Sequence, residues 1–152
     1  MNRDLIFCTN RANASMLLEH LNACDNSYFP KLSTRVDIYA YTNKILANGI
    51  RFEAWDGIQL VGLLVLYRGE FEKKTAFITN VSVLPEFCSQ GIASKLLEIS
   101  LNYLRSDGFT CTELEVSHLN SVACSLYEKF GFVASTKTEQ CIKMQLRIQQ
   151  SI

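Results

Sequence analysis

The stretch that decides the fold runs from Val81 to Ser94 and reads VSVLPEFCSQGIAS. Valine alternates with small polar residues before Pro85, a pattern typical of a strand that ends in a turn. After Gly91, apolar residues recur at helical spacing, which predicts a helix that ends near Ser106. These apolar residues are Ile92, Leu96, Leu97, Leu101 and Leu104. A short loop of small residues therefore joins a strand to a helix.

The loop before this helix offers backbone groups rather than large side chains to a ligand. The first turn of a helix carries N–H groups without partners and a partial positive charge, so it is suited to binding an anion. We therefore predict a pyrophosphate site formed by consecutive backbone N–H groups. These belong to Ser89, Gln90, Gly91, Ile92, Ala93 and Ser94. For such a loop taken alone, a tight turn without a ligand is the alternative.

A second stretch, from Asn120 to Phe132, reads NSVACSLYEKFGF. Together the two stretches resemble the GCN5-related N-acetyltransferase (GNAT) family, whose motif A has the form Gln/Arg-x-x-Gly-x-Gly/Ala. The second stretch is similar to motif B, Asn-x-x-Ala-x-x-Leu-Tyr-Glu-Lys-x-Gly-Phe, at every defined position. Motif A matches at Gly91 and Ala93 but has Cys88 where Arg or Gln is usual. This departure removes a side-chain donor and leaves the backbone donors in place.

The resemblance implies an α/β (α+β) fold, a single GNAT-like domain over residues 1–152. It implies a mixed central sheet of about seven strands flanked by four helices, in the order β-α-α-β-β-β-α-β-α-β-β. A strand, a crossover helix and a further strand predict a parallel pair around the long helix, which places the loop before Gly91 at the carboxyl end of a strand. Sequence patterns predict strands at 5–9, 50–55, 60–67, 75–84, 111–117, 132–135 and 139–147, and helices up to 23 (capped by Asn10 or Asn13) and at about 35–47, 91–106 and 120–130.

The resemblance also implies that acetyl-CoA is the acyl donor. Backbone groups of Val81, Ser82 and Val83 would pair with its pantetheine arm as an added strand does. The alternative is that these three residues pair only within the sheet. Asn120, a preferred residue for a helix N-cap, would cap its helix and also reach the donor.

Tyr127 and Glu115 are the predicted catalytic residues. In the family, the tyrosine of Leu-Tyr-Glu lies beside the thioester sulfur and protonates the departing thiolate, a role that suits a phenol. In the branch that acts on ribosomal proteins, a Glu at the spacing of Glu115 accepts the amine proton, and a partly buried carboxylate could do so through a water. The structural alternative for Tyr127 is a tyrosine that only packs in the core. For Glu115 it is a carboxylate on a solvated strand face. His118 is a rival base.

The predicted acceptor site is a wall formed by Phe29 and Arg35, with Tyr28 and Tyr39 beside them, and by Trp55 on a strand. Core packing is the alternative for these aromatic residues. Our first choice of acceptor is the primary amine of a small molecule, such as an amino sugar, an amino acid or a polyamine. The N-terminus or a lysine of a protein is the alternative within the class. A non-catalytic CoA-binding sensor is the alternative from another class.

Composition narrows the remaining possibilities. The chain has 152 residues, 48% hydrophobic and 20% charged, with a formal net charge of zero. These values are typical of a globular protein and give no basic surface for nucleic acid and no charged run for a membrane. No signal peptide or membrane span is predicted, so we expect a cytoplasmic protein. Scattered cysteines and two distant histidines predict reduced thiols and no metal. A homodimer remains possible.

Overall fold

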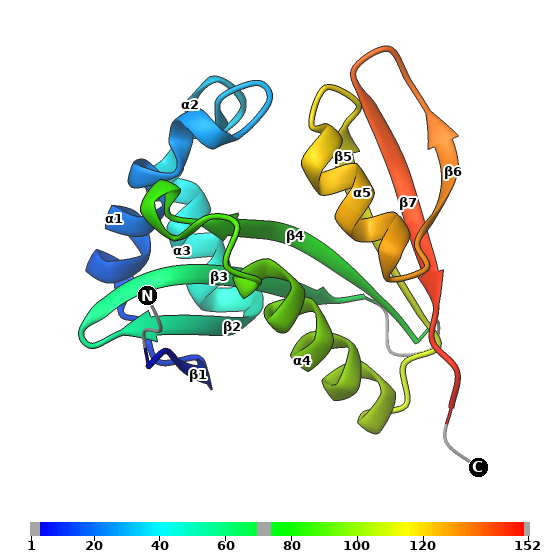
Figure 1. Ribbon diagram of the computed structural model, residues 1–152, viewed down its shortest axis with the longest axis horizontal. Helices are drawn as coiled ribbons and strands as arrows, with labels where there is room; N and C mark the ends of the chain where they lie inside the picture. The colour runs from blue at the N-terminus through cyan, green and yellow to red at the C-terminus, as the bar shows by residue number, and fades with distance from the viewer. Residues whose placement is uncertain (1–3, 70–73, 151–152) are drawn as a thin grey trace.

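The computed structural model describes residues 4–69 and 74–150, and one seven-stranded sheet forms its centre (Figure 1). The strand order is β1-β2-β3-β4-β5-β7-β6, and every neighbouring pair is antiparallel except β4 and β5. The predicted mixed sheet and its parallel pair are therefore confirmed. The strands are β1 (Ile6–Thr9), β2 (Gly49–Asp56), β3 (Gln59–Arg68), β4 (Thr75–Val83), β5 (Cys111–Ser117), β6 (Val133–Lys137) and β7 (Cys141–Arg147).

Helices account for most of the remaining described chain. They are α1 (Ala14–Ala23), α2 (Leu32–Arg35), α3 (Ile38–Asn48), α4 (Ile92–Ser106) and α5 (Ser121–Lys129), with 3-10 turns η1 (Asp25–Ser27) and η3 (Pro85–Phe87). The helix predicted at about 35–47 is present as α3 but starts three residues later, because the chain is extended at Val36 and Asp37 caps a new helix. The Asp37 carboxylate accepts a hydrogen bond from the N–H of Ala40 at 3.0 Å, which is a typical N-cap. None of the described helices is long and apolar enough to cross a membrane.

Two asparagines near the N-terminus were both candidates for the cap of α1. Asn13 is the cap, since its Oδ1 accepts a hydrogen bond from the N–H of Met16 at 2.9 Å. Asn10 adopts a left-handed conformation, with φ of 57°, and its Oδ1 accepts from the N–H of Arg51 at 2.8 Å. Asn10 therefore ties the end of β1 to β2.

A buried carboxylate holds the segment between β1 and α1. Glu53 on β2 is fully buried and accepts hydrogen bonds from the N–H groups of Arg11 and Ala12, at 2.8 and 3.1 Å. Its carboxylate also pairs with Arg51 Nε at 3.2 Å. The indole N–H of Trp55 donates to Glu53 at 3.1 Å, and Trp55 is only 1% exposed. The prediction that Trp55 lines the acceptor site is therefore wrong, because this tryptophan is buried and hydrogen-bonded to the Glu53 carboxylate.

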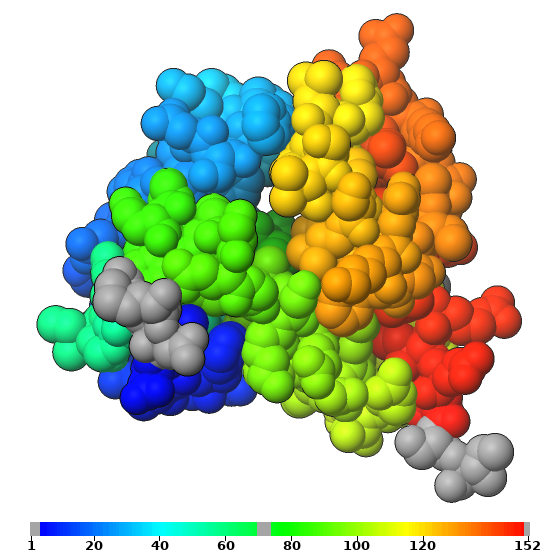
Figure 2. Space-filling view, in the orientation of Figure 1, coloured from blue at the N-terminus to red at the C-terminus, as the bar shows by residue number. Residues whose placement is uncertain are grey.

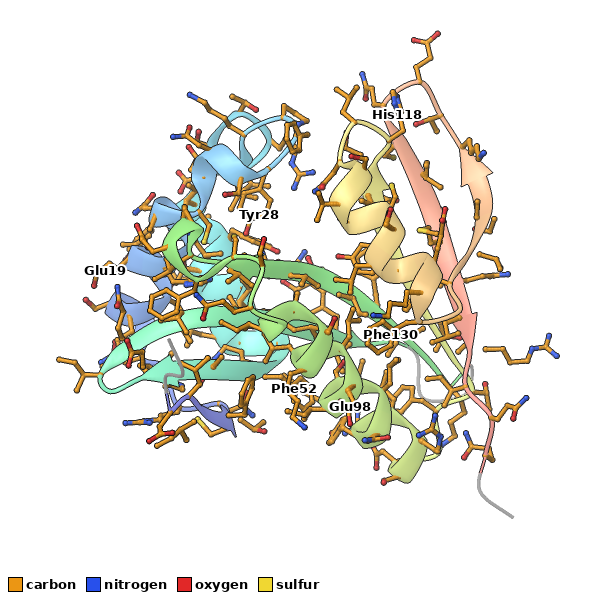
Figure 3. All side chains as sticks on the ribbon, viewed as in Figure 1. Glu19, Tyr28, Phe52, Glu98, His118 and Phe130 are labelled. Carbon is orange, nitrogen blue, oxygen red and sulfur yellow. The ribbon has the colours of Figure 1, made fainter. Side chains whose placement is uncertain are left out.

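Two apolar cores cover the two faces of the sheet. Helices α4 and α5 contribute to one core, and α1 and α3 contribute to the other. Phe52, labelled in Figure 3, belongs to the first core and packs edge-on against Tyr103 of α4, with ring centroids 5.5 Å apart. Gly62 on β3 lets α4 approach closely, because a Cβ there would lie 2.6 Å from Cγ2 of Ile92. This contact fixes the first turn of α4 against the sheet.

A bulge in β4 decides which side chains point to which face. Leu66 pairs with Ile78 and Val65 pairs with Asn80, so Thr79 is the extra residue of β4. A bulge places two successive side chains on one side of a strand. Thr79 accordingly contacts Tyr41 of α3, whereas Val81 packs against the core that contains α4.

Candidate active site

A cleft opens where β4 and β5 separate. The two strands pair from Thr75 with Cys111 to Ile78 with Leu114, and their outer ends diverge (Figure 1). A pocket lies between these ends, and its walls come from the segment before α2, the end of α2, the outer halves of β4 and β5, and one side of α5. In Figure 2 the light-blue and yellow surfaces of these segments face each other. Because β4 has no strand partner on this edge beyond Ile78, a peptide-like ligand could pair with its backbone.

The loop before α4 presents N–H groups that no protein acceptor uses. Ser89 and Gly91 have φ of 65° and 80°, and Gly91 is the N-cap of α4. The N–H groups from 89 to 94 donate no hydrogen bond within the described part of the chain, and the first helical bond runs from Lys95 to Gly91 at 3.0 Å. Nothing lies within 4 Å of a Cβ placed on Gly91, so the loop is open. This set of donors fits a diphosphate.

Cys88 lies beside this loop, at the position where the family has Arg or Gln. Its side chain is exposed, and its sulfur lies 3.6 Å from the carbonyl oxygen of Leu84 and 3.8 Å from that of Val83. The thiol therefore interacts with the end of β4. It leaves the backbone N–H groups of the loop open.

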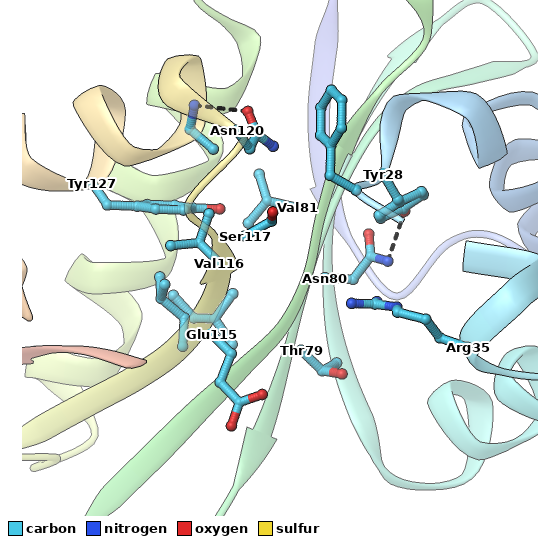
Figure 4. A pocket seen from close by; sticks show the side chains of 14 residues that line it. Tyr28, Arg35, Thr79, Asn80, Val81, Glu115, Val116, Ser117, Asn120 and Tyr127 are labelled. Atoms are coloured by element: carbon cyan, nitrogen blue, oxygen red, sulfur yellow. Dashed lines mark hydrogen bonds between the residues drawn. The ribbon is translucent and has the colours of Figure 1, made fainter. Parts of the chain in front are cut away.

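Tyr127 on α5 points its hydroxyl into the cleft, toward Val81 and Ser117 (Figure 4). The residue is 7% exposed, and its ring packs edge-on against Phe132 with centroids 5.8 Å apart. No hydrogen bond to its hydroxyl forms within the residues that the structure describes. Burial, and to a smaller degree Cys124, raises the pKa of Tyr127 above its usual value. The phenol therefore stays protonated at neutral pH and has a proton to donate.

Asn120 and Glu115 also line this cleft. The Oδ1 of Asn120 accepts a hydrogen bond from the N–H of Ala123 at 3.1 Å and so caps α5, as predicted. Glu115 on β5 is exposed, so the partial burial that we expected for a base is absent. Its carboxylate has no ion pair among the described residues, because the neighbouring Lys143 pairs with Glu113 at 3.4 Å.

The other predicted acceptor residues divide into two groups. Phe29 and Arg35 line the cleft, and Figure 4 shows Arg35 on the opposite side of β4 from Glu115. Tyr39 is 67% exposed and does not line the cleft. His118 lies at the outer end of β5, where its Nε2 contacts the carbonyl oxygen of Glu139 (Figure 3). His118 is therefore not placed to act as the base.

The polar residues that β4 supplies to the cleft were not predicted from the sequence. Thr79 and Asn80 line it, and the amide of Asn80 lies 2.8 Å from the hydroxyl of Tyr28. Asn80, a polar residue within a largely apolar strand, was the sequence feature that could have indicated them. No group of three His, Cys, Asp or Glu side chains within 4–69 and 74–150 could hold a metal ion.

Comparison with known proteins identifies the family. A family model described as the acetyltransferase (GNAT) family matches residues 14–132. The chain belongs to this family. The resemblance inferred from the two motifs is confirmed, and the match extends well beyond them toward the N-terminus.

Named GNAT relatives match part of the chain. It is 40% identical over 57 residues to the [ribosomal protein bS18]-alanine N-acetyltransferase of Haemophilus ducreyi, which covers 38% of this chain and 39% of that protein. It is 30% identical over 83 residues to N-alpha-acetyltransferase 30 of Schizosaccharomyces pombe, which covers 53% of this chain and 55% of that protein. The matched regions thus span about half or less of these relatives.

A solved structure shows the same GNAT fold over nearly the whole chain. The Bacillus subtilis acetyltransferase in complex with CoA superimposes with a TM-score of 0.74 at 19% identity, covering 96% of this chain and 100% of that one. The predicted fold is therefore confirmed.

Proposed function

We propose that this protein is an acetyl-CoA-dependent N-acetyltransferase whose acceptor is the α-amino group of a peptide or protein N-terminus. One observation carries the proposal: in a member of the GNAT family, the unpaired hydroxyl of Tyr127 faces the free edge of β4 across a cleft. This hydroxyl makes no hydrogen bond within the described residues and lines the cleft, so it is free to donate its proton to a departing thiolate there.

The donor binds along β4 and α4 in this proposal. The free N–H groups of Ser89 to Ser94 hold the diphosphate of acetyl-CoA, and the backbone of Val81 to Val83 pairs with the amides of its pantetheine arm. Asn120 lies beside the same cleft. Acetyl-CoA supplies a thioester carbonyl that an amine nitrogen can attack.

Two side chains move protons. The amine nitrogen forms a bond to the acetyl carbon while the carbon–sulfur bond breaks and its electron pair goes to sulfur. Tyr127 gives its phenolic proton to this sulfur. The nitrogen loses a proton to the Glu115 carboxylate through water, because this carboxylate is exposed at the wall of the cleft.

The shape of the acceptor side favours a chain over a compact small molecule. A second pocket adjoins the cleft through Phe29, Arg35 and Glu115 and continues to Gln140 and Cys141 near the turn between β6 and β7. The two pockets share these lining residues, so the residues that follow a reacting N-terminus can lie in the second pocket. The printed names of the relatives, an alanine N-acetyltransferase and an N-alpha-acetyltransferase, point to the same class.

An amine panel tests this proposal. The purified protein is mixed with acetyl-CoA and one of three probe types, and release of free thiol is followed. The probes are peptides that begin with Ala, Ser or Met, an N-terminally blocked peptide with an internal lysine, and the small amines glucosamine and spermidine. We expect turnover with the free N-terminal peptides and acetylation of their α-nitrogen by mass spectrometry. Preference for a small amine would contradict the choice of acceptor, and binding of acetyl-CoA without any turnover would favour the sensor.

Glu115→Gln tests the base with the preferred peptide. The substitution keeps the shape of the side chain and removes the carboxylate that accepts the proton. We expect a lower kcat and loss of the acidic limb of the pH–rate profile. A profile identical to that of the unmodified protein would remove Glu115 from the mechanism. Glu113→Gln, two residues before Glu115 on the same face of β5, is the matched control.

A further inference from the structure

The acceptor side of the cleft carries a single positive charge. Arg35, the last residue of α2, lines both the cleft and the second pocket that adjoins it. Among the described residues that line these two pockets, Arg35 is the only cation and Glu115 is the only anion. Figure 4 shows the two side chains on opposite sides of β4. The cleft therefore presents opposite charges on its two walls.

The backbone around Arg35 is held in place by its neighbours. Leu32, at the start of α2, is 1% exposed and belongs to the core that α1 and α3 share. The carboxylate of Asp25 accepts hydrogen bonds from the N–H and the hydroxyl of Ser33, both at 2.7 Å. The N–H of Val36 donates to the carbonyl oxygen of Leu32 at 3.0 Å. The chain on both sides of Arg35 is thus fixed, while its own side chain is exposed.

No acidic side chain in the described part of the chain offsets the charge of Arg35. The guanidinium forms no ion pair and no hydrogen bond there. The acids nearest to it in the sequence have other partners, since Asp25 accepts from Ser33 and Asp37 accepts from the N–H of Ala40. A guanidinium stays charged at any pH at which the protein is folded, and its N–H groups match the two oxygens of a carboxylate. Arg35 is therefore available to an anionic group of a ligand.

The position of this charge restricts the acceptor. An amine arrives largely protonated, and the carboxylate of Glu115 attracts it, whereas Arg35 repels any second positive charge on the same molecule. Arg35 and Tyr127 line the same small cavity of about 100 Å³. Groups a few bonds from the reacting nitrogen therefore lie on the side of Arg35. An acceptor that carries a carboxylate at this separation from its amine matches both charges of the cleft.

We propose that Arg35 is a specificity-determining residue that binds a carboxylate of the acceptor, so that the preferred peptides carry Asp or Glu at their second or third residue. The proposal rests on the peptide acetyltransferase activity proposed above and narrows its substrate class. The α-carboxylate of a free amino acid offers the same chemistry, an amine with a carboxylate a few bonds away. Because Arg35 is exposed, the gain lies between that of a surface ion pair and that of a buried charged hydrogen bond, at about fivefold to tenfold in kcat/KM.

Peptides that begin with Ala and differ at one residue test this proposal. Asp, Asn or Lys is placed at the second residue in one series and at the third in another, and kcat/KM is measured by thiol release. In at least one series we expect Asp to exceed Asn by about fivefold to tenfold and Lys to fall below Asn. Arg35→Gln should remove the advantage of Asp, and Arg35→Glu should invert the order so that Lys exceeds Asp. Lys31→Gln, which removes an exposed cation that lines neither pocket, is the matched control and should keep the order.

The outcomes separate this proposal from the one on which it rests. Equal kcat/KM for Asp and Asn in both series of the unmodified protein would overturn the role of Arg35 while peptide acetylation stands, and this result needs no variant. A preference for Asp that persists in Arg35→Glu, at an unchanged KM for acetyl-CoA, would overturn it as well. Free alanine against alaninamide distinguishes the source of the carboxylate. Alanine acetylated faster than any peptide, with the advantage lost in Arg35→Gln, would support the role of Arg35 and overturn the peptide acceptor. Absence of turnover with every amine would overturn both proposals.

Discussion

Tyr127→Phe should separate catalysis from stability, because the structure gives the hydroxyl no partner to lose. The ring keeps its edge contact with Phe132, and no hydrogen bond to the hydroxyl forms in the described part of the chain. Removal of a hydroxyl that lines the cleft and makes no hydrogen bond there should change the free energy of unfolding by less than about 0.5 kcal/mol or should increase it. Most tyrosines that anchor a core would show a loss instead.

The same substitution should strongly slow acetyl transfer. Loss of a general acid lowers the rate by about 10²- to 10⁴-fold, which corresponds to about 3–5 kcal/mol in the activation barrier. The KM for acetyl-CoA should stay close to its original value, because the N–H groups before α4 are unchanged. Urea unfolding measures the change in stability, and thiol release at saturating substrate measures the change in the rate of acetyl transfer.

Tyr103→Phe is the matched control for this prediction. Tyr103 lies on α4, packs edge-on against Phe52, and accepts a long 3.4 Å contact from Arg68. Tyr103 does not line the cleft, so the kcat of the Tyr103→Phe variant should equal that of the unmodified protein. A Tyr127→Phe variant that keeps kcat within about twofold, against the loss expected for a general acid, would refute the proton-donor role. A clear loss of stability would refute the argument that the hydroxyl has no structural partner.

Three further predictions concern stability. Glu53→Ala should lower the free energy of unfolding measured in urea by about 3–5 kcal/mol, because it leaves the buried Arg51 without its negatively charged partner; a loss below 1 kcal/mol would contradict this. Gly62→Ala should cost about 1–3 kcal/mol and raise the KM for acetyl-CoA, since its Cβ would press on Ile92 at the start of α4. Burial lowers the pKa of His20 to about 4 in the folded protein, against about 6.5 in the unfolded chain, so its contribution to stability is complete above pH 6.5 and about 3 kcal/mol is lost as the pH falls to 4. His20→Gln should flatten this part of the stability curve, and an unchanged slope would argue against it.

The spacing of apolar residues and the positions of turn residues correctly predicted most of the strands and helices. Strand β5 begins and ends at the predicted residues, and α4 begins one residue after the predicted start. The long helix has a regular apolar stripe, and Gly91 and Gly108 at its two ends both have positive φ. Such signals are local, so they can be seen in a single sequence.

Features that depend on contacts between distant residues could not be predicted in the same way. Trp55 was assigned to the acceptor site because an aromatic on a strand can face a ligand, but its partner is the buried Glu53 carboxylate. That carboxylate is needed by N–H groups of Arg11 and Ala12, more than forty residues away in the sequence. The split between α2 and α3 is different, because its signal is local: Asp37 is a preferred N-cap residue directly before α3.

The bulge at Thr79 explains why the two halves of the proposed site lie where they do. Beyond it, Val81 and Val83 pack toward the core that contains α4, on the side of the proposed donor site. Asn80 and Ser82 face the other way, toward Tyr28 and His20. A strand without the bulge would alternate strictly from Ile78 onward and would turn Asn80 and Ser82 toward the apolar core. Burial of two polar side chains there without partners would be costly, and the bulge avoids this cost by directing Asn80 and Ser82 to the face where they have polar partners.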